Sequence, residues 1–182
     1  GAPQGLSVFQ DGVRINEPFG DVVNYDLIPQ KAISSMALMP GSNPLFGLNT
    51  LGGAISIQTR NGADFSATEL EGSMGSFGRN QVDFSLGTLT ESGDLFLTAS
   101  KFEEDGWRDF SPSDVEQLFA KAGWDLDDGR VSLAITHGAS DLTGNGVLPK
   151  SFLQQRRDQI FTYPDNTKND MTMGTLNAET WW

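Results

Sequence analysis

Alternation of apolar and polar residues runs through the sequence from about residue 67 onward and sets the strongest limit on its fold. The clearest case is the segment 117–126, QLFAKAGWDL. Successive side chains of a β-strand point to opposite faces, so one face of this segment would carry Leu118, Ala120, Ala122, Trp124 and Leu126. The other face would carry Gln117, Lys121 and Asp125, together with Phe119 and Gly123.

The same alternation returns near 67–75, 80–87, 94–102 and 130–138, and another such segment begins near Asp170. These segments group Val82 with Phe84 and Leu86, Leu95 with Leu97 and Ala99, and Val131 with Leu133 and Ile135. We therefore predict a mainly β protein with about six such strands. One-sided apolar strands suit either a soluble sheet packed on a core or a transmembrane β-barrel, and alternation alone leaves both open.

The connections between these segments differ in length. TLTESG (88–93) and DLDDG (125–129) are short, whereas 103–116 and 139–169 are long. Short turns at one end and long loops at the other are typical of outer-membrane barrels, whose long loops face outside. The connection GSFGRN (75–80) should be long by this count and is short. Aromatic residues near strand ends fit interfacial girdles, although each alone is an ordinary aromatic: Phe77, Phe102, Trp107, Trp124, Trp181 and Trp182.

The first third of the chain does not show this repeated alternation. Residues 6–16 predict a hairpin that turns at Asp11-Gly12. Pro18, Gly20 and Pro29 punctuate a loop, followed by a helical turn near 30–33 and a short strand near 35–39. SNPLFG, from Ser42, predicts the start of a short helix, and residues 54–60 predict a further strand.

The glycine-rich stretch 40–60, PGSNPLFGLNTLGGAISIQTR, does not have the pattern of a phosphate loop. A P-loop needs a lysine after its last glycine, and a dinucleotide fingerprint needs a following helix. Neither condition holds after Gly52 and Gly53, because an alternating strand follows.

Composition and motifs weigh against several other classes of function. The chain has no cysteine, so it can form no disulfide or thiolate metal site. The net charge of −12 weighs against nucleic acid as a partner. His137 is the only histidine and no G-x-S-x-G occurs, so a hydrolase is a poor reading. The stretch DLTGNG from Asp141 imitates the start of a calcium loop, but Phe152 stands where a glutamate is needed. We predict no enzyme activity, no cofactor and no metal site.

Three segments resemble the TonB-dependent outer-membrane transporters: 8–29, 40–60 and 72–87. The first carries the D-G-V hairpin of that family's plug domain. The third carries a barrel-opening G-S-F-G. The second resembles G-x-x-[SN]-x-L-[YF]-G, with one residue fewer between Gly41 and Leu45, and then follows G-G-x-I-x-I-x-[TS]-[KR]. The matching residues are Gly41, Leu45, Phe46, Gly47, Gly52, Gly53, Ile55, Ile57, Thr59 and Arg60. We interpret Gly41, Gly47, Gly52, Gly53 and Arg60 as a structural plug motif rather than ligand contacts.

The resemblance implies two parts. Residues 1–64 would be the C-terminal part of a mixed α/β plug domain, and residues 65–182 would be the first six or so antiparallel transmembrane strands of an incomplete barrel of about 22 strands. The chain departs from the family where charged residues often precede the glycine segment, because Ser34, Ser35 and Ala37 stand there. The family's N-terminal energy-coupling box is absent, and both ends of the sequence look cut. We expect the isolated chain, with its unpaired strand edges, to be insoluble in buffer.

The resemblance also implies a function. The intact protein would take up a scarce solute, such as a ferric siderophore, cobalamin or an oligosaccharide, across the outer membrane of a Gram-negative bacterium. Its partners would be the energy-coupling protein TonB, the extracellular solute or metal chelate, and outer-membrane lipid. The runner-up reading is a soluble β-sandwich that acts as a binding module.

Candidate solute-binding residues follow from position alone. On the plug loops they are Asn16, Glu17, Pro18 and Phe19, and Asn43, Pro44, Leu45 and Phe46. On the barrel side they are Trp107 and the loop 144–167. The pair Arg156-Arg157 in that loop either meets an anion or is simply solvated.

Overall fold

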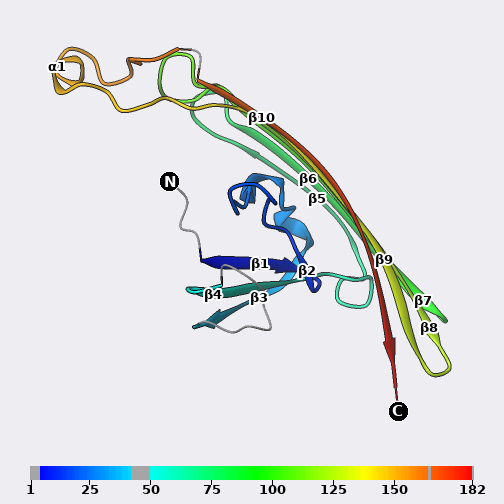
Figure 1. Cartoon of the computed structure of the whole chain (residues 1–182). Coiled ribbons are helices and arrows are strands. Elements are labelled where there is room, and N and C mark those ends of the chain that lie inside the picture. Colours follow the sequence, from blue (N-terminus) through cyan, green and yellow to red (C-terminus); the bar gives the residue numbers. More distant parts are fainter. Residues whose placement is uncertain (1–4, 42–49, 164, 182) are drawn as a thin grey trace.

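Two β-sheets account for nearly all the regular structure in the computed structural model, which describes residues 5–41, 50–163 and 165–181. A four-stranded sheet, the small sheet, lies on the concave side of a long curved six-stranded sheet, the large sheet (Figure 1). We call the described residues from 5 to 59, which include the small sheet and the segment that covers it, the first unit.

The small sheet has the strand order β2-β1-β4-β3 and is of mixed direction. β1 (Leu6–Gln10) pairs antiparallel with β2 (Val13–Arg14) and parallel with β4 (Gly53–Thr59), which pairs antiparallel with β3 (Ile33–Pro40). The predicted hairpin is confirmed. Asp11 (φ 47°) and Gly12 (φ 83°) both have positive φ, which is the conformation that a two-residue turn of the favoured hairpin type requires.

The segment between β2 and β3 covers one face of the small sheet. It contains two short 3₁₀ turns, η1 (Tyr25–Leu27) and η2 (Gln30–Ala32), and the second matches the predicted helical turn. Ile28 from this segment packs with Val8 and Ile57 from the sheet in a buried apolar cluster. The first unit therefore has a small core of its own.

The large sheet is a simple antiparallel meander, as six consecutive alternating segments predict. Its strands are β5 (Thr68–Met74), β6 (Asn80–Thr90), β7 (Gly93–Glu104), β8 (Ser113–Leu126), β9 (Gly129–Thr143) and β10 (Asn166–Thr180). β10 begins earlier than the alternation near Asp170 indicated. A one-turn helix, α1 (Lys150–Leu153), lies in the long β9–β10 connection.

The two faces of the large sheet are reversed relative to those of a soluble sheet. The outward face exposes large apolar side chains from all six strands, among them Leu70, Val82, Leu95, Leu118, Trp124, Leu133, Ile135 and Leu176. The inward face, toward the first unit, buries mostly polar residues: Asp83, Ser85, Asp94, Thr98, Thr136, Ser140 and Thr175. Phe96, Phe119 and Ala134 are buried apolar residues of the inward face, and they pack with Ala32 of the first unit.

Two parts of the expected fold class stay predictions. The described sheet is open, with β5 and β10 as its edges, so the barrel count of about 22 strands has no test here. The helix predicted from Ser42 falls outside the described residues. Among the residues that the structure describes, no helix has the length and apolar character needed to cross a bilayer.

Candidate functional site

The segment between β2 and η1 carries the first set of predicted solute contacts. In Figure 1 it lies above the small sheet, on the side of the long connections of the large sheet. The Asn16 side chain accepts a hydrogen bond from the Val8 backbone N–H (2.8 Å) and donates one to the Leu6 carbonyl (3.0 Å). Asn16 therefore holds this segment against β1.

Further bonds brace the same segment. Arg14 forms an ion pair with Asp21 (2.7 Å), and the Asn24 amide donates a hydrogen bond to Glu17 (2.5 Å). Pro18 and Phe19 stand at the tip, where Phe19 is 94% exposed. The result is a fixed loop that presents an apolar ring to solvent.

The second set of predicted contacts, Asn43, Pro44, Leu45 and Phe46, lies outside the described residues, as does Gly47 of the glycine motif.

Two cavities on the side of the long connections open between the first unit and the inward face of the large sheet. The first, of about 360 Å³, lies between the braced loop and β10 and is lined by Ile15, Glu17, Val23 and Met171, among others. The second, of about 580 Å³, lies along the long-loop half of β6 to β9, with Asp26 and Gln30 on its other side. Among the predicted contacts that the structure describes, Glu17 lines the first cavity and Gly144, at the start of the loop 144–167, lines the second.

A cation and an aromatic ring dominate the second cavity. The Arg79 guanidinium lies 5.1 Å from the centroid of the Phe102 ring, within the range of a cation–π contact. Arg79 pairs with no carboxylate among the described residues. Beside it, the Gln117 amide donates to the carbonyls of Asp26 (2.6 Å) and Ile28 (3.1 Å). The cavity therefore offers a solute the positive charge of Arg79, several amide groups and the acidic residues Asp26 and Glu104.

The two long connections of the large sheet are fastened into one lobe. The Arg108 guanidinium donates to the carbonyls of Asn145 (3.3 Å), Gly146 (3.2 Å) and Gln159 (3.0 Å). The rings of Phe110 and Tyr163, one from each connection, are 4.9 Å apart. Trp107, the predicted barrel-side contact, is exposed on this lobe next to Arg108.

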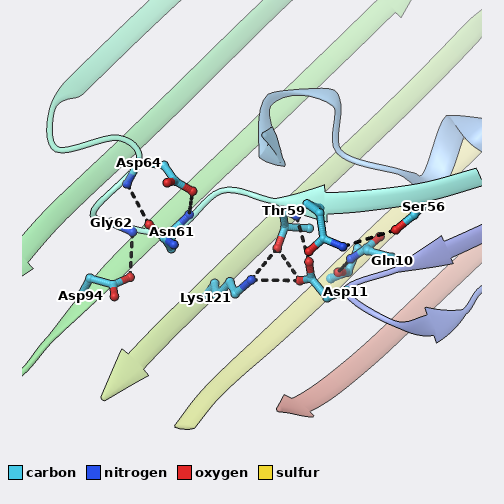
Figure 2. A network of polar contacts seen from close by, with 11 residues as sticks. Gln10, Asp11, Ser56, Thr59, Asn61, Gly62, Asp64, Asp94 and Lys121 are labelled. Atoms are coloured by element: carbon cyan, nitrogen blue, oxygen red, sulfur yellow. Dashed lines mark hydrogen bonds and ion pairs between the residues drawn. The ribbon is translucent and has the colours of Figure 1, made fainter. Parts of the chain in front are cut away.

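The first unit is held to the large sheet by a compact polar contact, shown in Figure 2. The Lys121 ammonium, from β8, lies 3.1 Å from Asp11 Oδ2 and 3.0 Å from Thr59 Oγ1. Asp11 also accepts the Thr59 backbone N–H (2.9 Å) and its hydroxyl. The Asp11 and Lys121 side chains are only 4% and 14% exposed. One cation of the large sheet, Lys121, thus binds the ends of both β1 and β4.

The connection from β4 to β5 is fixed separately. The carboxylate of Asp94, 1% exposed, accepts the Gly62 N–H (2.8 Å) and pairs with Arg130. Phe65 packs edge-on against Phe96 at 5.7 Å. A side chain at Gly62 would overlap the backbone of Leu95, so the chain passes directly against the sheet here.

The described members of the glycine motif have backbone roles. Gly53 has φ 122°, and a Cβ there would lie 2.4 Å from the Met39 carbonyl oxygen. Gly41 also has positive φ, and a Cβ on Gly52 would lie 3.0 Å from the Gly5 oxygen. Arg60 donates to the Ile33 carbonyl (3.2 Å) and lies over the Phe65 ring. These contacts favour a structural role for the motif.

An ion pair at the edge of the large sheet is a further contact with the first unit. Lys31 of η2 bonds to Glu71 of β5, and this hydrogen bond raises the pKa of the Lys31 ammonium above its ordinary value. No three acidic or histidine side chains come together as a metal site within the described ranges of the chain.

Solved structures share this arrangement, although no family model and no curated protein matches the sequence. The siderophore receptor PiuA from Acinetobacter baumannii aligns with a TM-score of 0.74 and 14% identity, over 96% of this chain and 26% of that chain. The ferric-catecholate import receptor Fiu from E. coli K12, in its open form, aligns with a TM-score of 0.67 and 18% identity, over 82% and 22%. The copper transporter OprC aligns with a TM-score of 0.60 and 18% identity, over 78% and 24%.

The chain has the fold of a TonB-dependent receptor fragment. This confirms the resemblance drawn from the glycine and D-G-V segments. The chain spans about a quarter of the length of these receptors, and at such identities the likeness is one of fold.

Within the TonB-dependent receptor fold, sequence reasoning missed the two cavities and the contacts between the first unit and the large sheet. Lys121 was visible only as a polar position of an alternating strand, and Arg79 only as part of the short connection 75–80. The parity of Lys121 did place it on the polar face, but its partners Asp11 and Thr59 are far away in the sequence.

Proposed function

We propose that the chain is part of a TonB-dependent receptor that takes up a scarce solute across the outer membrane of a Gram-negative bacterium. In this proposal residues 1–64 belong to the plug and residues 65–182 supply the first strands of the barrel wall. The observation that carries the proposal is the exposed apolar face of the large sheet, with the first unit on the opposite face.

The height of the apolar face fits an outer membrane. Along β8 it runs from Leu118 to Leu126, which is about 26 Å of extended chain. A strand tilt of about 35–45° reduces this to roughly 20 Å, near the ~25 Å apolar band of such barrels. Two residues beyond Leu118, toward the long connections, Glu116 pairs with Lys101 (2.6 Å). Charged residues therefore begin where the lipid headgroups would lie.

The rival reading, a soluble β-sandwich, requires the apolar faces of two sheets to pack together. In the structure the apolar face of the large sheet points away from the small sheet. The inward residues that meet the first unit are mostly polar, such as Lys121, Gln117 and Thr136. This arrangement supports the membrane proposal over the sandwich.

Solute binding is assigned to the side of the long connections. Phe19 and Pro18 at the plug tip, Arg79 in the second cavity and Trp107 on the lobe would contact the solute. Residues 43–46 remain candidates from the sequence. The similar structures include a ferric-catecholate import receptor and a copper transporter, which favours a metal or a metal chelate as the cargo. Binding would use aromatic and polar contacts, with no chemical change of the solute.

TonB and outer-membrane lipid would be the remaining partners. TonB would act through a plug segment that precedes this sequence. Lipid would cover the outward apolar residues.

Uptake by the intact receptor that contains this sequence tests the proposal. Cells without other receptors would be given ferric-catecholate and ferric-hydroxamate complexes, cyanocobalamin and Cu(II), with and without functional TonB. We expect uptake of at least one probe that requires both receptor and TonB. Phe19→Ala should weaken its binding, whereas Leu89→Ala, an exposed apolar residue at the short-turn end, should not. Equal uptake of every probe in cells with and without the receptor would contradict the proposal.

A further inference from the structure

Two of the contacts that attach the plug to the wall differ in character, beside the bonds of Gln10 to Thr136, Gln117 to the Asp26 and Ile28 carbonyls, and Lys31 to Glu71. At the first, Lys121 binds Asp11 and Thr59 (Figure 2). At the second, Asp94 binds the Gly62 N–H and Arg130. Asp11 and Thr59 end two parallel strands, so the first contact holds the small sheet, whereas the second holds only the connection to β5.

The contact of Lys121 with Asp11 and Thr59 borders a cavity, so these two residues have room to move away from Lys121. A polar cavity of about 580 Å³ lies on the short-turn side and is lined by Asp11, Thr59, Lys121, Ser132 and Glu179, among others. Separating a buried ion pair is costly when it leaves bare charges in a dry interior. Here both charges face polar groups as they part, so the contact is strong when closed and can be opened.

The contact at Asp94 is more enclosed: Arg130 lines the same cavity, but Asp94 does not. Its carboxylate is almost wholly covered, and Phe65 seals the connection against Phe96. The backbone at Gly62 also lies directly against the backbone of β6 and β7, so that a Cβ on Gly62 would overlap it.

We infer that Lys121 is the positioning residue that keeps the plug closed, and that plug movement during transport breaks the contact of Lys121 with Asp11 and Thr59 while residues 61–67 stay on the wall. This inference rests on the proposed function. It assigns the carboxylate to the plug and the cation to the wall, in a chain where Ser34, Ser35 and Ala37 replace the family's usual charges.

Single-channel conductance of the intact receptor in planar lipid bilayers tests the closing role. Lys121→Gln should raise solute-independent conductance by tenfold to 10²-fold, because breaking a buried pair shifts equilibria by at least that factor. Affinity for the transported probe should change less than twofold. Lys121→Arg should conduct like the wild type, and Asp11→Lys with Lys121→Asp should restore closure in part. Lys101→Gln, which breaks an outward ion pair of the same wall, is the matched control.

Two outcomes would overturn the closing role. Wild-type conductance in Lys121→Gln would show that Lys121 does not hold the plug. Raised conductance together with lost probe affinity and no rescue by the exchanged pair would show general misfolding. A receptor from which the plug is deleted must conduct; if it does not, the receptor proposal itself fails.

Cross-linking tests which contact opens. The sequence has no cysteine, so pairs can be introduced cleanly. A cleavable bifunctional thiol reagent that joins Asp11→Cys to Lys121→Cys should abolish uptake but not binding, and cleavage should restore uptake. Joining Phe65→Cys to Phe96→Cys should leave uptake near the wild-type rate. Normal uptake with the first bridge, or loss with the second, would contradict the inference.

Discussion

A charge placed on the outward face of the large sheet separates the membrane account from the soluble one. Ile135 lies on β9 near the middle of the apolar face and is 48% exposed. Its partners across the strands are Ala120 and Gly174. If this face meets lipid, Ile135→Arg puts a guanidinium near the centre of the bilayer, far from the paired rim at Lys101 and Glu116.

The size of the effect follows from that position. Arginine at the midplane of an outer-membrane barrel costs about 2–4 kcal/mol, which is roughly 30- to 10³-fold in the folding equilibrium. In a soluble protein the same exposed position would tolerate arginine within about 0.5 kcal/mol. Ser132→Arg, three residues earlier on the inward face and beside a polar cavity, is the matched control and should cost less than about 1 kcal/mol.

Denaturant titration of the intact receptor folded into phospholipid vesicles measures both variants. We expect a loss of about 2–4 kcal/mol for Ile135→Arg and little change for Ser132→Arg. A neutral Ile135→Arg, or an equal loss in both variants, would refute the assignment of the outward face to lipid.

Three further predictions concern the inward and long-loop sides. Arg108→Gln should separate the two long connections. Trypsin should then cleave the intact receptor faster after Arg156. An unchanged cleavage rate would contradict the view that Arg108 fastens the lobe. Asp94→Asn should cost about 3–5 kcal/mol in unfolding titrations because it leaves Arg130 without its buried partner, whereas Asp125→Asn, 54% exposed, should cost about 0–1 kcal/mol. Phe46→Ala should weaken binding of the transported probe in an equilibrium assay, and an unchanged affinity would remove that residue from the site.

The strands of the large sheet were readable from the sequence because each depends on a local property. The period of two in 117–126 fixes both the strand and its faces, and β8 has these faces in the structure. The Asp11-Gly12 turn was readable for the same reason, since its positive φ values are a local requirement. The alternation could not tell which face meets solvent, because lipid and a protein core select the same residues.

The contacts that join the two sheets were not readable. Lys121 meets Asp11 and Thr59 only because the small sheet lies on the concave face at one particular height, and no local pattern reports that height. Phe102 is a residue for which the prediction from the sequence was wrong. It was grouped with the lipid-interface aromatics, yet it lies on the inward-facing cavity beneath Arg79. Its position in the strand, two residues from Ser100, already assigned it to the polar face.

Residue-by-residue lipid contact along β8 tests the central claim most directly. Single cysteines at 117 to 124 of the intact receptor would carry a fluorophore, and a quencher attached to lipid acyl chains would report contact with the bilayer. The account predicts strong quenching at Leu118, Ala120, Ala122 and Trp124 and weak quenching at the positions between them. Equal quenching at all positions, or quenching confined to Gln117, Phe119, Lys121 and Gly123, would contradict it.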